Sequence, residues 1–96
     1  MKIDMKYKYG DELYIIHLRR ITKGTIVNIK VTKEYKIQYI LIPCVDKDSN
    51  LYGGDFHSIN YEYDMYETKK EAKKAWMKMF PKDKFNEKTF VRCLEE

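Results

Sequence analysis

The chain is poor in the residues that most often bind metals. Its 96 residues include only two cysteines and two histidines. A structural zinc site normally shows its ligands in pairs that lie a few residues apart. None of the four residues has such a neighbour, so their spacing argues against a zinc site. The four are His17, Cys44, His57 and Cys93.

Serine, a common nucleophile in covalent catalysis, is equally scarce. Ser49 and Ser58 are the only two serines. A nucleophile also needs a base and an orienting acid, and only His57 lies near either serine in the sequence. The carboxylates show no paired spacing either. The sequence therefore favours a protein that is not an enzyme and that needs no cofactor.

Long apolar runs are also missing. No stretch approaches the roughly 20 residues of a membrane-spanning helix. Residues 1–10, MKIDMKYKYG, alternate polar and apolar side chains and so lack the apolar core of a signal peptide. Cys44 and Cys93 lie far apart and form no C-x-x-C pair. We therefore expect a cytoplasmic protein without membrane association, in which both thiols are reduced.

The chain is rich in aromatic and charged residues instead. Hydrophobic residues make up 44% and aromatic residues 15% of the sequence, which excludes a disordered chain. The length suits a single domain, residues 1–96, with one small core. The net charge of +4 is uneven: it is +5 over residues 1–44, −4 over 45–66 and +3 over 67–96.

Five segments have the composition or the alternation of strands. Residues 2–9 alternate as a half-buried strand or an extended lead-in, and residues 12–18 are rich in β-formers. Residues 24–31 and 35–42 alternate on either side of a three-residue polar link, which predicts a hairpin. Residues 59–66 alternate again and predict a further strand.

The alternation also predicts which side chains share a face. In the predicted hairpin, Pro43 should end the second strand or lie at an edge, because proline cannot donate to a ladder. Val27, Ile29 and Val31 should share one face with Thr25, and Tyr35, Ile37, Tyr39 and Leu41 should share another.

One helix is predicted over residues 69–80. Thr68 and Glu71 have the spacing of a capping box. Apolar residues then recur at helical spacing until Pro81 stops the helix. The remaining tail, 82–96, fits either a short helix capped by Asn86 or a closing strand. The apolar residues of the helix are Ala72, Ala75, Trp76, Met79 and Phe80.

The first half of the chain resembles SH3-like small barrels of the KOW and Tudor kind. In such barrels an aromatic or aliphatic residue precedes Gly-Asp, a V-x-V strand follows, and a G-T-V-x-x-I strand comes next. The segments that carry the resemblance are YKYGDELYII (7–16) and ITKGTIVNI (21–29). The matching residues are Gly10, Asp11, Leu13, Ile15, Gly24, Ile26 or Val27, and Ile29.

The resemblance implies a mainly β fold of the α+β class. It predicts a strongly bent, five-stranded antiparallel SH3-like barrel over about 5–66, followed by the amphipathic helix near 69–80. Such barrels host many unrelated functions, so the fold does not fix the activity. The segment 66–72, YETKKEA, is also similar to the strand-to-helix step of small uncharacterised proteins from phages and mobile elements of low-GC bacteria.

The segment 46–56, DKDSNLYGGDF, begins with the D-x-D-x-N spacing of a calcium loop. Such a loop needs glycine at its sixth position and glutamate at its twelfth. Those positions hold Leu51 and His57. Asp, Ser, Asn and Gly are also typical turn residues, so we predict a polar turn between strands.

Two surfaces are candidates for function. The first is an acidic strip that contacts another protein, and the phage resemblance implies an inhibitor of a bacterial defence component such as a CRISPR nuclease. The predicted contact residues are Asp46, Asp48, Asp55, Glu62 and Asp64.

The alternative is a nucleic-acid-binding accessory protein that uses a basic surface over residues 19–36. Lysines there also fit a solvated face that protects an edge strand from aggregation. The predicted contact residues are Arg19, Arg20, Lys23, Lys30, Lys33, Tyr35 and Lys36, with Tyr35 stacking on a base.

Overall fold

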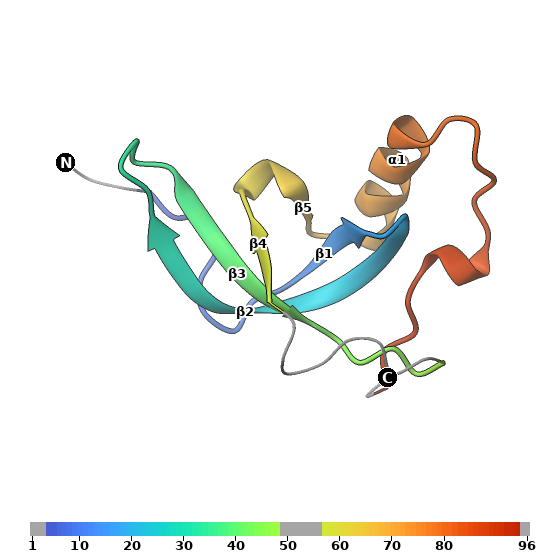
Figure 1. The fold of residues 1–96 in the computed structure, drawn as a ribbon, viewed down its shortest axis with the longest axis horizontal. Coiled ribbons are helices and arrows are strands. Elements are labelled where there is room, and N and C mark those ends of the chain that lie inside the picture. The colour runs from blue at the N-terminus through green and yellow to red at the C-terminus, as the bar shows by residue number, and fades with distance from the viewer. Residues whose placement is uncertain (1–3, 49–56, 95–96) are drawn as a thin grey trace.

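A computed structural model describes residues 4–48 and 57–94. Five antiparallel strands form one sheet in the order β4-β3-β2-β1-β5. The sheet curls strongly into a half-barrel with one helix, α1, at one end (Figure 1), which confirms the α+β class. The elements are β1 (Glu12–His17), β2 (Arg20–Val31), β3 (Ile37–Pro43), β4 (Ser58–Asn60), β5 (Met65–Tyr66) and α1 (Lys69–Met79).

A two-residue turn joins β1 to β2, so β2 begins earlier than the sequence predicted. Leu18 and Arg19 have φ values of 50° and 62°, the pattern of a type I′ hairpin turn. Residues other than glycine are strained at positive φ. The Trp76 indole N–H donates a hydrogen bond of 2.8 Å to the Arg19 carbonyl, so α1 holds the turn in place.

A β-bulge changes the predicted face of β2. The register with β3 shifts between Ile26 and Asn28. The extra residue takes Val27 off the face that it was predicted to share with Ile29. Ile26 is buried in the core instead, and Val27 is exposed.

The predicted hairpin is confirmed by the pairing of β2 with β3. Tyr39 and Leu41 are fully buried, and β3 ends at Pro43 as expected. Tyr35 does not join its predicted partners. It lies in the turn with a φ of 62°, and its side chain is exposed.

The single strand predicted over 59–66 is wrong. The segment forms β4, a 3₁₀ turn η1 (Glu62–Asp64) and β5. β4 pairs with β3 and β5 pairs with β1, so η1 carries the chain between the two edges of the half-barrel. Alternation alone could not predict this crossing, because it carries no information on which strand a segment pairs with.

The inner face of the curled sheet holds the first core. Tyr7 reaches this core from the lead-in segment, residues 4–9, which forms no strand. Met5 and Tyr9, which alternate with Tyr7 in the sequence, are exposed. The Tyr7 and Tyr39 rings meet edge to face at 5.6 Å between centroids. The core residues are Tyr7, Leu13, Ile15, Ile26, Tyr39, Leu41 and Met65.

Helix α1 covers the other face of β1 and β2 and forms a second core. The predicted cap is confirmed, because the Thr68 Oγ1 accepts the Glu71 N–H at 3.1 Å. Ala72 and Trp76 are buried against Ile21, as the helical spacing predicted. Partly buried aromatic residues complete this core, among them Tyr14, Tyr66, Phe80, Phe85 and Phe90.

The tail takes neither the helix nor the closing strand that the pattern left open. Asn86 does act as a cap, but only for one 3₁₀ turn, η2 (Glu87–Thr89). The chain then passes along β2, where the Val91 N–H donates to the Ile21 carbonyl at 2.8 Å. The tail is therefore mostly irregular and returns from α1 towards the end of β3 (Figure 1), and its Phe85 and Phe90 pack against the second core.

Candidate functional site

A hollow of about 480 Å³ lies between the lead-in segment, η1 and the start of α1. Exposed Tyr63 is at its rim, so we call it the Tyr63 hollow. Three glutamates and one lysine line it, which gives the hollow a net negative charge. The lining residues are Lys6, Tyr7, Glu62, Tyr63, Met65, Glu67 and Glu71.

Polar contacts fix the floor of the Tyr63 hollow. The Tyr7 hydroxyl donates to the Glu67 carboxylate at 3.1 Å, and Lys6 lies 3.7 Å from the same carboxylate. The Glu71 carboxylate accepts the Glu67 N–H at 3.4 Å. The pKa of Tyr7 is raised above its usual value mainly by burial, and the hydrogen bond to Glu67 raises it further. Tyr7 therefore stays neutral and keeps Glu67 in place.

The turn η1 presents an aromatic pair beside these carboxylates. The rings of Tyr61 and Tyr63 stack at 5.6 Å with an interplanar angle of 12°. Gln38 donates to the Tyr61 hydroxyl at 3.1 Å, which ties the pair to β3. Tyr63 is 74% exposed, so a stacked aromatic ring faces solvent.

The predicted acidic strip is divided by the fold. Glu62 and Asp64 lie in η1, where the Asp64 carboxylate accepts the Tyr61 N–H at 3.1 Å. Only Glu62 of this pair lines the Tyr63 hollow. Asp48 lies beyond the far end of β3, 4.0 Å from Arg92. Asp55 falls outside the described residues.

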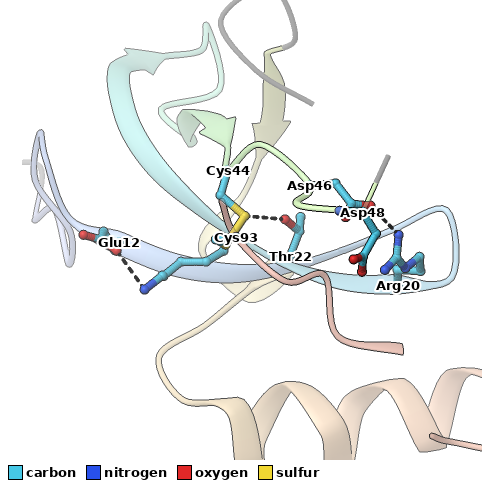
Figure 2. Close-up of a disulfide and its surroundings, with 8 residues drawn as sticks. Glu12, Arg20, Thr22, Cys44, Asp46, Asp48 and Cys93 are labelled. Atoms are coloured by element: carbon cyan, nitrogen blue, oxygen red, sulfur yellow. Dashed lines mark hydrogen bonds and ion pairs between the residues drawn. A yellow bond between two sulfur atoms is a disulfide. The ribbon is translucent and has the colours of Figure 1, made fainter. Parts of the chain in front are cut away.

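Asp46 is fully buried and has a structural role. Its carboxylate forms an ion pair of 2.7 Å with Arg20 and accepts the Asp48 N–H at 2.9 Å (Figure 2). The second interaction is a local side-chain turn at the start of the segment 46–56, whose residues 49–56 lie outside the described part of the chain, so the predicted polar turn is not tested. Burial leaves Asp46 no surface to offer to a partner.

The basic candidates near the β1–β2 turn are paired with acids. Arg20 also donates to the Lys88 carbonyl at 3.1 Å, which links it to the tail. Within the described part of the chain, each of the three cations therefore has an acidic neighbour. The pairs are Arg19 with Asp83 at 3.4 Å, Arg20 with Asp46 at 2.7 Å, and Lys23 with Glu12 at 3.2 Å.

The other basic candidates lie at the opposite end of β2. Lys30 is near the end of that strand, and Lys33, Tyr35 and Lys36 belong to the β2–β3 turn. The 12 residues of β2 separate this turn from Arg19 (Figure 1). The basic surface predicted over residues 19–36 is thus two surfaces.

The cysteines are joined, which corrects the prediction of two reduced thiols. Cys44 and Cys93 form a disulfide across 49 positions of sequence, with their Cα atoms 5.4 Å apart (Figure 2). Cys44 follows β3, and Cys93 lies in the tail. The prediction failed because spacing in sequence does not report which segments the fold brings together.

The side chains that most often bind metals do not cluster in the described residues. Across 4–48 and 57–94, no three His, Cys, Asp or Glu side chains gather into a metal-binding group. Asn50, which belongs to the D-x-D-x-N pattern, lies outside these ranges. No helix of the described chain is long and apolar enough to cross a membrane.

Of the seven residues that line the Tyr63 hollow, only Glu62 was among the contact residues predicted from the sequence. Glu71 was interpreted only as part of the capping box with Thr68, and Glu67, which precedes Thr68, was given no role. Glu67 precedes the cap and lies outside α1, so helical spacing could not relate the two carboxylates. The Glu71 carboxylate instead accepts the Glu67 N–H at the helix start.

Searches of protein-family models, curated proteins and solved structures found no match to this chain. No relative therefore supplies a function or a set of site residues. The resemblance to KOW and Tudor barrels is supported at the level of a curled, five-stranded antiparallel sheet, consistent with a small β-barrel fold.

Proposed function

We propose that the chain is a small, non-enzymatic binding protein that occupies a basic surface of a partner protein through the Tyr63 hollow. One observation carries the proposal: an exposed, stacked tyrosine stands at the rim of a hollow lined by three carboxylates.

The chemistry of the hollow suits a protein partner. Tyrosine is enriched at the energetic centres of interfaces, because it buries a large ring and still forms a hydrogen bond. The stack on Tyr61 holds Tyr63 before binding, so little conformational freedom is lost on association. Glu62 and Glu67 complement a lysine or arginine, and such complementarity favours correct orientation and rapid association.

The phage resemblance suggests the class of partner. A nuclease of a bacterial defence system, such as a CRISPR nuclease, carries basic surfaces where it binds nucleic acid. An acidic protein surface that covers such a region would compete with the substrate. The cytoplasmic location remains a prediction that agrees with this partner. The redox state of Cys44 and Cys93 in the cell tests this location, because the cytosol keeps most thiols reduced and the structure joins these two cysteines.

The test is a pull-down from bacterial lysate, done with and without nuclease treatment, with three tagged proteins. These are the wild type, the hollow variant Y63A/E62K, and the control variant Y35A/E34K. The control changes an exposed tyrosine and a neighbouring glutamate in the same way, at the β2–β3 turn. We expect a discrete, stoichiometric partner that the wild type and the control retain and the hollow variant loses.

Two results would contradict the proposal. One is a partner that the hollow variant retains at the wild-type level. The other is a set of captured proteins that disappears when the lysate is treated with nuclease, since nucleic acid would then bridge the contact.

A further inference from the structure

Helix α1 carries an unusual density of positive charge on its exposed side. Five lysines and one glutamate occur among its 11 residues, and all five lysines are exposed. Lys70, Lys74 and Lys78 recur every four residues, so the Cα atoms of successive lysines lie about 6 Å apart along the helix axis. This row lies opposite the buried residues Ala72 and Trp76. We call the five lysines the α1 lysine face: Lys69, Lys70, Lys73, Lys74 and Lys78.

The α1 lysine face is not neutralised by the described part of the chain. Across residues 4–48 and 57–94, no ion pair joins one of these lysines to an acid. The helix's own acid, Glu71, is engaged with the Glu67 N–H. By contrast, Arg19, Arg20 and Lys23 of the predicted basic surface are all paired.

Helix stability does not explain this charge. Lysines four residues apart on a helix repel one another. Lys69 and Lys70 also place positive charge in the first turn, where the helix dipole disfavours it. The packing of Trp76 against the sheet stabilises α1 in spite of this repulsion.

Aromatic rings of the tail hold two of these lysines in position. The Lys73 ammonium lies 4.7 Å from the centroid of Phe85, and the Lys69 ammonium lies 5.7 Å from that of Phe90. Both phenylalanines are partly buried in the second core. Cation–π contacts of this kind fix the position of an ammonium group without removing its charge.

We propose that the α1 lysine face binds the phosphate backbone of a nucleic acid without reading its sequence. A row of lysines that have no acidic partner among the described residues supplies the electrostatic attraction that dominates such binding. A lipid surface fits less well, because amphipathic helices bind membranes by inserting an apolar side. The apolar side of α1 is already packed against the sheet. This site uses a different surface from the proposed protein contact and does not depend on it.

Fluorescence anisotropy of a labelled duplex of about 20 base pairs tests the proposal across a salt series. The variant K70Q/K74Q/K78Q removes the central row, and glutamine preserves helix propensity. The control variant K30Q/K33Q/K36Q removes the same charge at the far end of β2, where the sequence predicted a competing nucleic-acid contact. Circular dichroism confirms that each variant is folded, and single variants replace the triple if it unfolds.

We expect the affinity of the wild type to fall linearly with salt on logarithmic axes, with a slope of about −3 to −5. The helix variant should lose at least about tenfold in affinity at low salt, and its slope should be shallower by about 3. Each single variant should reduce the slope by about 1. The control variant should stay within about twofold of the wild type.

Three outcomes would overturn the proposal. The first is no binding of the duplex by the wild type at low salt. The second is an equal loss in the control variant, which would mean that only total charge matters. The third is binding to vesicles of phosphatidylcholine and phosphatidylserine, roughly 3:1, that matches duplex binding and depends on the same lysines. That result would assign the face to a membrane surface instead.

Discussion

The disulfide between Cys44 and Cys93 should contribute strongly to stability. It closes a loop across 49 positions, and in the chain-entropy account such a loop stabilises the fold by about 4 kcal/mol at 25 °C. For a domain of under 100 residues, this corresponds to about 20 °C in the unfolding temperature. We therefore expect the variant C44A/C93A to be markedly less stable than the oxidised wild type.

Urea denaturation measures the effect. With a urea dependence of about 1–2 kcal/mol per molar, the midpoint should fall by about 2–4 M in the variant. A phosphine reductant provides the matched control, since it should lower the midpoint of the wild type and leave the variant unchanged. The two proteins should then unfold at similar urea concentrations.

Hydrogen exchange should locate the change at the junction of β3 and the tail. The Lys47 N–H donates to the Arg92 carbonyl at 2.7 Å, and the Leu94 N–H donates to the Val45 carbonyl at 2.9 Å. Both amides should exchange faster in C44A/C93A, because the covalent link beside them is gone. Equal midpoints for the two proteins would refute this reasoning, as would two thiols that react with maleimide in the native protein without reductant.

Three further predictions concern single side chains. Asp46→Asn should lower the free energy of unfolding by about 3 kcal/mol in urea denaturation, because it leaves Arg20 without its buried charged partner. A decrease below about 0.5 kcal/mol would contradict the structural role of Asp46. Trp76→Phe should cost about 1–3 kcal/mol in thermal unfolding by leaving the Arg19 carbonyl unpaired, and unchanged stability would show that the turn holds itself. Since the raised pKa of Tyr7 favours the neutral phenol in the folded state, the free energy of unfolding should be level below pH about 10 and fall as the pH rises through the raised pKa. Tyr7→Phe should reduce that fall, and an identical pH profile would contradict the assignment.

The hairpin and the helix could be predicted from the sequence because each depends on local signals. The alternation of 35–42 and the polar link before it identify a hairpin wherever the rest of the chain lies. The cap at Thr68 and the spacing of Ala72 and Trp76 likewise need no distant partner. Both elements formed where the pattern indicated.

The errors arose where distant segments decide the outcome. The bulge at Val27 depends on how β2 bends to follow β3. The break at η1 depends on the two edges that β4 and β5 must reach. The disulfide needs the tail to return to the end of β3, which no spacing rule reports.

The candidate surfaces were harder to predict than the fold because burial and pairing rearrange charge. Asp46 and Arg20 were assigned from the sequence to two different surfaces, and the structure pairs them with each other. Neither Glu67 nor the α1 lysine face was predicted as a contact, yet each lies on a surface to which we assign binding.

The two proposed surfaces meet at the start of α1, and the helix dipole helps to explain their arrangement. The partial positive charge of a helix N-terminus lowers the cost of gathering carboxylates such as Glu67 and Glu71 near it. The lysines extend from the same end along the outer side of the helix. A partner that presents a basic protein surface beside bound nucleic acid would complement both surfaces: its basic residues would face the Tyr63 hollow, and its nucleic acid would face the α1 lysine face. Attraction to each surface weakens with salt, so only the matched variants can show whether the two act together or apart.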